Sequence, residues 1–158
     1  MPTHAEKRLL HHTPKQLFDL VADVDKYPEF LPWCIGIRVK EPAQEEGNDV
    51  ILADMVIGYK IFRETFSSKV ICQKPDRIDV TYFDGPFKYL NNHWIFEAQD
   101  NGECLIDFYF DFEFKSRFFQ AAIGAVFNEA VKMMISAFEK RADALYGNGK
   151  KELADVEH

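Results

Sequence analysis

Five histidines and three cysteines are the residues of this chain that could bind a metal ion or act as nucleophiles. His4, His11 and His12 lie on or beside an expected edge strand near the beginning, while His93 lies in a later strand on the face opposite Trp94. The sequence has no HxxxH, HExxH or Cys/His spacing of the kind that binds zinc, no Gly-x-Ser-x-Gly motif and no glycine-rich phosphate loop. We therefore expect no catalytic residue and no metal site.

Cys34 directly follows Trp33 and allows two interpretations. It could be a nucleophile, but a free cysteine is more often a small buried hydrophobic residue. Cys72 and Cys104 lie far from it in the sequence, and the odd number of cysteines argues against a disulfide framework. The pattern predicts free thiols in a reducing compartment.

Glu64 also has two possible roles. It lies on the strand face that carries Phe62 and Phe66. If this face lines a cavity, a carboxyl group among aromatic rings could donate a hydrogen bond to a ligand carbonyl or act as the acid of a cyclase. Alternatively, Glu64 is solvated on the convex face or pairs with Arg63 or Lys69.

Two segments near the N-terminus should position these residues. After a first strand over residues 4–11, Thr13–Gln16 has the cap, proline and glutamine of a helix start, and the helix should run to about Val24. Tyr27–Cys34 is then a compact aromatic segment between prolines. It either forms a lid or a membrane-touching patch through Phe30 and Trp33, or plugs one end of the sheet.

Six further strands are expected, over residues 35–40, 49–57, 62–72, 77–83, 89–98 and 104–114. The last strand alternates strictly, with one face formed by Cys104, Ile106, Phe108, Phe110, Phe112 and Phe114. Such alternation is typical of a sheet with one buried face, and the short connections indicate an antiparallel meander.

One long final helix is expected from a cap at Ser116 to Gly147, about 30 residues or about 45 Å. Its apolar arc is wider than a surface helix needs and holds Phe119, Ile123, Val126, Phe127, Ala130, Val131, Met134, Phe138 and Leu145. The polar stripe comprises Asn128, Lys132, Ser136, Glu139 and Asp143. Four small residues are expected to leave room for a cavity at the N-terminal half, namely Ala121, Ala122, Gly124 and Ala125.

The composition limits the possible partners. The chain has 158 residues, 15 of them phenylalanine, and a formal net charge of -7. The negative charge argues against DNA or other nucleic acid as a non-specific partner, and it leaves only hydrophobic docking on a membrane open. With no signal peptide or membrane-spanning segment in sight, we expect a cytoplasmic protein, with peripheral contact to the inner membrane left open.

The fold class expected from these elements is α+β. A seven-stranded curved antiparallel sheet should wrap around a long C-terminal helix, with one or two short helices after the first strand. Residues 1–147 are expected to form a single domain, and residues 148–158 a flexible polar tail.

The ordered set of motifs resembles the helix-grip fold of the START and polyketide cyclase-like superfamily, and within it the coenzyme Q-binding branch, which chaperones ubiquinone for respiration. The residues that carry this resemblance are Asp25, Tyr27–Cys34, Gly58–Lys60, Phe62–Glu64, Asp84–Phe87, Trp94, Phe96, Phe108–Phe114, Ala137–Glu139, Arg141 and Ala142. A bacterial sister branch of ribosome-binding toxins is similar in most of these pieces. Trp33 and Phe62–Glu64 favour the quinone-binding branch.

The resemblance implies a non-enzymatic START-like lipid-binding domain that holds and delivers ubiquinone or a related isoprenoid quinone as ligand, with no cofactor. The expected ligand-binding residues are Phe30, Trp33, Phe62, Glu64, Phe66, Tyr82, Trp94, Phe108, Phe110, Phe112, Ile123, Phe127 and Met134. Arg63 and Asn92 are further polar candidates for the head group. The phenylalanine row allows a second interpretation, in which it fills the core.

Two other functions stay open. The chain could bind the large ribosomal subunit, as the sister branch does, which would require a basic surface patch. It could also be an aromatase/cyclase-type enzyme, which would require carboxylates or histidines that point into the cavity.

Overall fold

The computed structural model describes residues 3–31, 33–40, 43–59, 62–74, 76–124 and 127–147. The expected tail over residues 148–158 lies outside these residues. The strands are β1 (Thr3–Leu10), β2 (Cys34–Val39), β3 (Ala43–Glu45), β4 (Asn48–Tyr59), β5 (Phe62–Gln73), β6 (Arg77–Asp84), β7 (Phe87–Ala98) and β8 (Cys104–Phe114). The helices are α1 (Pro14–Ala22), the 3-10 helix η1 (Val24–Glu29), α2 (Arg117–Gly124) and α3 (Phe127–Tyr146).

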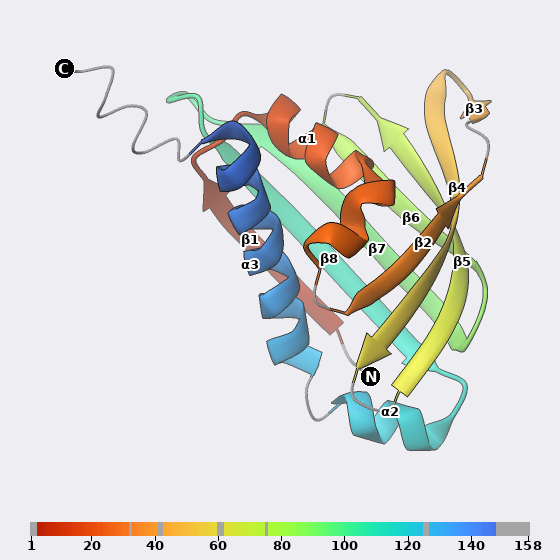
Figure 1. Cartoon of the computed structure of the whole chain (residues 1–158). Helices are drawn as coiled ribbons and strands as arrows, with labels where there is room; N and C mark the ends of the chain where they lie inside the picture. The colour runs from red at the N-terminus through yellow and green to blue at the C-terminus, as the bar shows by residue number, and fades with distance from the viewer. Residues whose placement is uncertain are drawn as a thin grey trace.

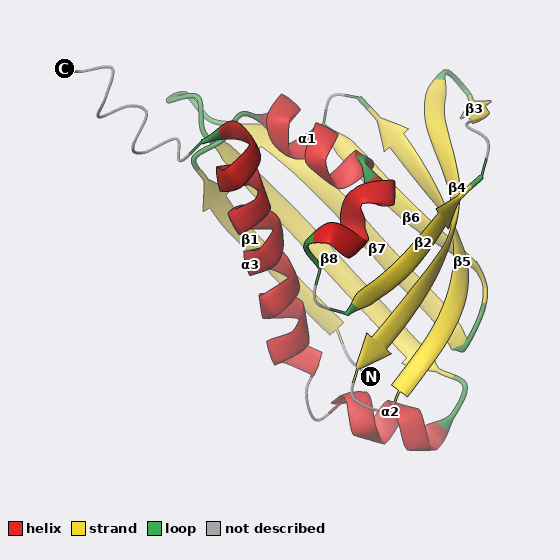
Figure 2. Ribbon diagram, in the orientation of Figure 1, coloured by secondary structure: helices red, strands yellow, loops and turns green. Residues whose placement is uncertain are grey.

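The sheet is one curved antiparallel layer with the strand order β1-β8-β7-β6-β5-β4-β2, and β3 pairs with β4. Helices α1, η1 and α3 all lie against the same concave face (Figures 1 and 2). The expected α+β helix-grip architecture is therefore confirmed. The eighth strand, β3, was not predicted, because its three residues are all exposed and carry no apolar alternation.

Strand β8 supplies much of the buried face. Its alternating residues Cys104, Ile106, Phe108, Phe112 and Phe114 are buried, as the period of two predicts. The strand lies between β1 and β7, so both of its edges are paired. Because the strand is paired on both sides and only one of its faces is buried, its apolar residues alternate regularly.

Helix α1 begins where the sequence predicts. The side chain of Thr13 accepts a hydrogen bond from the backbone N–H of Gln16, and the Gln16 side chain accepts one from the backbone N–H of Thr13. Its buried side is formed by Leu17, Phe18, Leu20 and Val21. The aromatic segment that follows begins as η1 and leads into β2, so it covers the concave face instead of extending from it.

The long C-terminal helix differs from the expectation. The structure has two helices, α2 and α3, on either side of residues 125–126, which lie outside the described part. Of these two helices, only α3, with 20 residues, lies along the concave face (Figure 1). Its inward side is formed by the buried residues Phe127, Val131, Met134, Ile135, Phe138 and Ala142.

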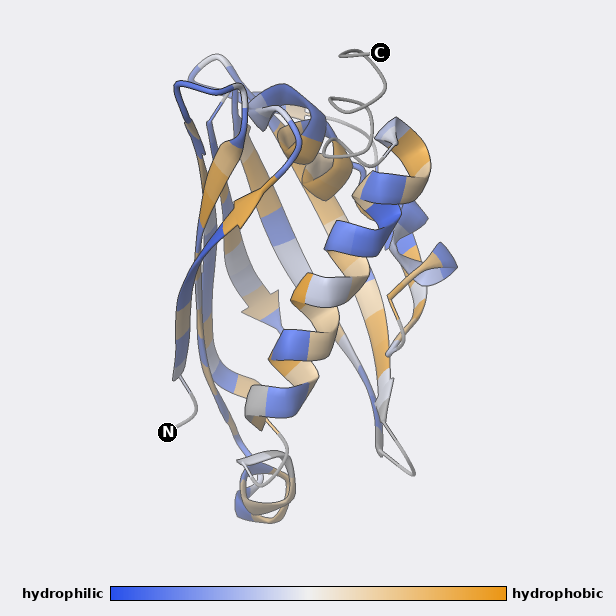
Figure 3. Ribbon diagram, turned by 90° about the vertical axis from the view of Figure 1, so that its left-hand side faces the viewer, coloured by the Kyte–Doolittle hydropathy of each residue, from blue (hydrophilic) through white to orange (hydrophobic). Residues whose placement is uncertain are grey.

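The small residues expected to leave room for a cavity lie elsewhere. Ala121, Ala122 and Gly124 are on α2 and are exposed to solvent, and Phe118 beside them is 74% exposed. Ala121, Ala122 and Gly124 therefore do not lie over a cavity on the concave face as predicted, and Ala125 lies outside the described residues. The apolar arc also ends early, since Leu145 is exposed. Figure 3 shows hydrophilic and hydrophobic segments alternating along α3.

Candidate ligand-binding cavity

A partly open apolar cavity of about 120 Å³ lies between the concave face of the sheet, η1 and α3. Its lining is formed by Val21, Val24, Tyr27, Leu31, Trp33, Ile37, Ala53, Met55, Ile57, Phe66, Ser68, Val70, Ile78, Val80, Phe87, Leu90, Asn92, Trp94, Phe110, Met134 and Phe138. A dry engineered cavity of about 150 Å³ in another protein binds benzene. The space in this protein is therefore of the size that accepts one ring or one isoprene-sized group.

The cavity is bordered on the sheet side by a row of short side chains. Ala53 on β4 pairs with Ser68 on β5, and both side chains are small and buried. Val70 and Val80, which also pair, continue this row of short side chains across β5 and β6. The sheet therefore recedes opposite Met134 and Phe138 of α3, which close the other side.

Five of the thirteen predicted ligand-binding residues line this cavity, namely Trp33, Phe66, Trp94, Phe110 and Met134. Phe108, Phe112 and Phe127 are fully buried core residues outside the lining. The structure places these three residues where the alternative interpretation, in which the phenylalanine row fills the core, expects them. The phenylalanine row is thus divided between filling the core and lining the cavity, which strand alternation cannot reveal.

The remaining predicted residues lie in other places. Phe30 lies in an outer groove beside α3, and Tyr82 packs against Phe66 and Phe87 while its hydroxyl accepts a hydrogen bond from Phe87 N at 3.1 Å. Glu64 is half-buried on β5 but does not line the cavity, and Arg63 is exposed. The side chains of Phe62 and Ile123 are outside the described part of the chain.

Several lining residues were missed by the sequence reasoning. Met55 and Ile57 share one face of β4, but Val56 between them is also apolar and half-buried, so this part of the strand shows no polar/apolar alternation that would identify its inner face. Tyr27 and Phe138 come together from η1 and α3, with ring centroids 5.3 Å apart. Contact between segments so distant in the sequence carries no local signal.

The polar groups of the cavity are few. The Tyr27 hydroxyl donates a hydrogen bond to the Val21 carbonyl, and burial raises the pKa of Tyr27, so it stays protonated. Asn92 donates from Nδ2 to the Tyr109 carbonyl at 2.9 Å. The described lining residues include no carboxylate, histidine, lysine or arginine. Such a lining suits a neutral, mostly apolar molecule.

Cys34 adjoins this region but has the properties of a packing residue. It is 4% exposed, and burial raises the pKa of its thiol to about 11. Because the thiolate is the nucleophile, very little of the reactive form exists near neutral pH. This favours the packing interpretation of Cys34.

A wider groove lies outside the cavity, between η1 and α3. It has a volume of about 610 Å³ and is lined by Phe30, Lys132, Met133, Ser136, Ala137, Lys140, Arg141 and Ala144. The Arg141 guanidinium lies 5.3 Å from the centroid of the Phe30 ring and 2.9 Å from Glu29. These two contacts join α3 to the end of η1.

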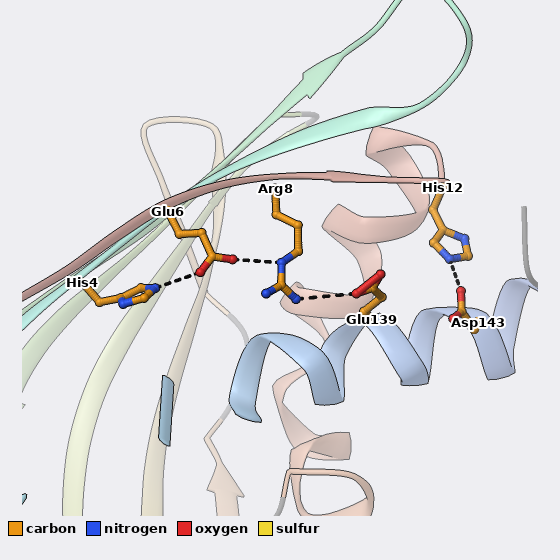
Figure 4. Close-up of polar contacts among 6 residues, drawn as sticks. All are labelled: His4, Glu6, Arg8, His12, Glu139 and Asp143. Carbon is orange, nitrogen blue, oxygen red and sulfur yellow. Dashed lines mark hydrogen bonds and ion pairs between the residues drawn. The ribbon is translucent and has the colours of Figure 1, made fainter. Parts of the chain in front are cut away.

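On the opposite side, polar residues join α3 to β1 (Figure 4). Arg8 Nε lies 2.9 Å from Glu6, and its Nη1 lies 3.5 Å from Glu139. His12 and Asp143 form a second link. Thus Glu139 and Asp143, which were expected on the polar stripe of the helix, contact the edge strand β1 and the corner that follows it. The histidines near the N-terminus all contact carboxylates, His4 that of Glu6, His11 that of Glu103 and His12 that of Asp143. No metal-binding cluster occurs in the described residues.

None of the helices in the described part of the chain combines the length and the hydropathy that a bilayer span requires.

Comparison with known proteins gives a consistent result. A family model described as polyketide cyclase / dehydrase and lipid transport matches residues 10–139. The ribosome association toxin RatA of Rickettsia prowazekii is 38% identical over 139 residues, which cover 85% of this chain and 92% of that protein. The mitochondrial coenzyme Q-binding protein COQ10 homolog B of Xenopus laevis is 32% identical over 155 residues, which cover 96% of this chain and 62% of that protein.

Among solved structures, the 18 kDa protein CC1736 of Caulobacter crescentus superposes with a TM-score of 0.76 at 36% identity. The match covers 93% of this chain and 99% of the other. The fold and the length of the two proteins therefore agree.

Proposed function

Because the chain belongs to the polyketide cyclase / dehydrase and lipid transport family, we propose that it is a non-enzymatic protein that binds an isoprenoid quinone or a similar neutral lipid. The observation that carries this proposal is the apolar cavity under α3. An aromatase/cyclase needs an acid or base that reaches its substrate. Tyr27 is the one ionisable side chain among the described lining residues, and its hydroxyl is already bonded to Val21.

The ligand would be held mainly by burial of apolar surface. Each methylene moved from water into the protein contributes about 0.8 kcal/mol before the costs of ordering the ligand. A cavity of about 120 Å³ takes only one end of an isoprenoid quinone. The rest of the molecule would extend from the cavity, and delivery to a membrane enzyme in respiration or quinone synthesis would use that exposed part.

The test is solvent extraction of the purified chain followed by mass spectrometry, after expression in cells rich in quinone. We expect a co-purified quinone in the wild type and much less in Ala53→Leu, which fills the cavity from β4. Ala5→Leu is the matched control, because Ala5 is exposed on β1. Absence of any neutral lipid in the wild-type extract would contradict the proposal.

Ribosome association is the second candidate function. It is supported by the relative from Rickettsia prowazekii that carries this name and by the outer face of α3. Lys132 and Lys140 are exposed there, and neither has an acidic partner within the described residues. Phosphate groups of RNA could bind such lysines even though the net charge of the chain is negative.

Sedimentation through sucrose gradients with large ribosomal subunits separates the two functions. If the second is correct, the chain moves with the large subunit, and the double substitution Lys132→Glu/Lys140→Glu releases it while Ala53→Leu has no effect. If lipid binding is the function, Lys132→Glu/Lys140→Glu leaves the amount of co-purified lipid unchanged.

A further inference from the structure

Helix α2 has an apolar face that lies in solvent. Phe118 is 74% exposed, more than any other large hydrophobic residue in the described part of the chain, and Ala121 and Ala122 are exposed as well. These two alanines follow Phe118 by three and four positions, so all three residues share one side of the helix. A surface helix normally presents polar residues to water. The outer face of α2 therefore has the composition of a contact surface.

The position of α2 is fixed by hydrogen bonds to the end of β8 and to the turn before β7. The Gln120 side chain accepts a hydrogen bond from Phe114 N at 2.8 Å, and Lys115 N donates one to the Pro86 carbonyl at 2.8 Å. The helix is thereby held beyond the strand ends, at the end of the molecule opposite the last turns of α3 (Figures 1 and 3). The exposure of Phe118 thus follows from where the sheet holds this helix.

A row of phenylalanine rings connects the exposed face of α2 with the cavity. Phe87 lines the cavity and stacks on Phe114, with ring centroids 4.7 Å apart. Phe114 contacts Phe119 of α2 at 6.3 Å, and Phe119 contacts Phe118 at 5.7 Å. Apolar side chains therefore continue from the cavity wall to the surface at this end of the molecule.

Two cationic residues precede Phe118. Lys115 and Arg117 are both exposed, and neither forms an ion pair with a carboxylate of the described residues, although the chain has a net charge of -7. An aromatic ring with lysine or arginine beside it is typical of segments that lie at the boundary between the headgroups and the acyl chains of a membrane. The cations there attract anionic lipids. The charges around Phe118 thus complement an anionic bilayer.

The size of this face also favours a bilayer over a protein partner. A phenylalanine side chain buries about 150–250 Å², and two alanines add little to this area. A stable protein–protein interface buries about 800 Å² on each partner. The face of α2 is therefore too small to hold a protein partner or a second copy of the chain by itself.

We infer that α2 docks on the surface of an anionic lipid bilayer, where Phe118 enters the layer below the headgroups and Lys115 and Arg117 contact lipid phosphates. The row of rings from Phe118 to Phe87 then brings one end of the cavity wall against the membrane. As the place where a bound lipid passes between cavity and membrane, this docking site rests on the proposed function.

Co-sedimentation of the full chain with vesicles of phosphatidylcholine and phosphatidylglycerol tests the inference. The wild type should bind, and Phe118→Ala should bind at least about 10-fold more weakly, because burial of the ring is lost. Arg117→Gln should weaken binding about 5-fold on these vesicles and should have little effect on vesicles of phosphatidylcholine alone. Leu145→Ala is the matched control and should bind as the wild type does, because Leu145 is 52% exposed but lies on the last turns of α3, at the opposite end of the molecule.

A second measurement reads the insertion of the side chain directly. Lipids with brominated acyl chains quench the fluorescence of a tryptophan that reaches them. The wild type has its tryptophans, Trp33 and Trp94, in the cavity wall. Phe118→Trp should therefore be quenched more strongly than the wild type when brominated vesicles are added, and Leu145→Trp should respond as the wild type does.

The outcomes distinguish this inference from the proposed function. If the wild type does not bind the vesicles, or if Phe118→Ala binds them equally well, the docking site is wrong, while a quinone in the solvent extract would still support the proposed function. Vesicle binding that depends on Phe118 without any co-purified lipid would contradict the proposed function and leave the docking site in place. If the wild type forms a dimer that Phe118→Ala abolishes, a second copy occupies this face and the inference is wrong.

Discussion

His12 Nε2 lies 2.7 Å from Asp143 Oδ1, which joins the corner after β1 to the last turns of α3. The His12 side chain is only 2% exposed, whereas that of Asp143 is 40% exposed. The His12 ring also contacts Tyr146 edge-on, with centroids 6.3 Å apart. Residues 131 positions apart in the sequence thus fix the end of α3 that closes the protein around the cavity.

Removing the carboxylate of this pair should destabilise the protein. Asp143→Ala leaves a buried imidazole nitrogen without its partner, so we expect a loss of about 1–3 kcal/mol in the free energy of unfolding. Asp143→Asn retains a hydrogen-bonding group and should lose less. Urea denaturation measures both, with Glu129→Ala, an exposed position on α3, as control. Equal stabilities of Asp143→Ala and Glu129→Ala would show that the link contributes nothing.

Phe138 should be the most sensitive residue of the cavity wall. It is 4% exposed and contacts the rings of Tyr27, Phe30 and Trp94. Phe138→Ala should cost about 3–5 kcal/mol, because the side chain is lost and a larger void remains. The matched control is Phe118→Ala on α2, where the ring is 74% exposed and we expect a change within about 0.5 kcal/mol. Duroquinone, a fully methylated benzoquinone, can test whether a small ring fills the enlarged cavity of Phe138→Ala. If it does, the thermal unfolding temperature of this variant should rise when duroquinone is added.

Gly85 should not tolerate a side chain. It has a φ of +143°, and a Cβ there would lie 2.7 Å from the Cβ of Phe66 and 3.0 Å from its Cα. Gly85→Ala should therefore displace Phe66, a lining residue, and both destabilise the fold and weaken binding. Gly102 also has a positive φ, of +84°, but nothing lies within 4 Å of an added Cβ. Gly102→Ala should cost only about 1–2 kcal/mol of backbone strain. If the two variants were equally stable, the close approach to Phe66 would not matter.

Asp23 should make the stability depend on pH. A hydrogen bond with Asp25, followed by partial burial and the charge of Asp25, raises the pKa of Asp23 to about 6. The folded state therefore holds this proton more tightly than the unfolded chain, whose carboxyl titrates near its ordinary value of about 4. The resulting stability is fully present below about pH 4 and is lost as the pH rises through about 6.

Asp23→Asn should remove this contribution to the pH dependence. Unfolding by urea at a series of pH values between about 4 and 7 should give a flatter profile for Asp23→Asn than for the wild type. Asp100→Asn, in an exposed turn, is the control and should keep the wild-type slope. An unchanged slope in Asp23→Asn would contradict the hydrogen bond with Asp25.

The elements with strong local signals could be predicted from the sequence. The alternation of β8 and the capping box at Thr13 depend on residues that are neighbours in the chain, so their patterns are visible in the sequence. Together with the motif order they define the helix-grip fold. The three-residue strand β3 and the division of the last helical segment into α2 and α3 carried no comparable pattern.

The sequence predicted the type of site, an apolar interior, but only some of the residues that line it. A surplus of phenylalanine and a wide apolar helix face indicate a large apolar interior, and Trp33, Phe66, Trp94, Phe110 and Met134 do line the cavity. Of the residues suggested for the head group, Asn92 lines the cavity, whereas Glu64, Arg63 and Tyr82 do not. Whether a side chain near the end of a strand reaches a cavity depends on the curvature of the sheet, which strand periodicity does not encode.

The sequence by itself determined which residues are apolar and how they alternate, and thereby the curved sheet and the helix it holds. Only the tertiary structure decided where the empty space lies, because a cavity is the volume that packing leaves between segments far apart in the chain. The short side chains of Ala53 and Ser68 face Met134 and Phe138 across that space. The same packing seals the Trp33 indole and turns Asp143 toward His12. No pattern within any one segment contains these relationships.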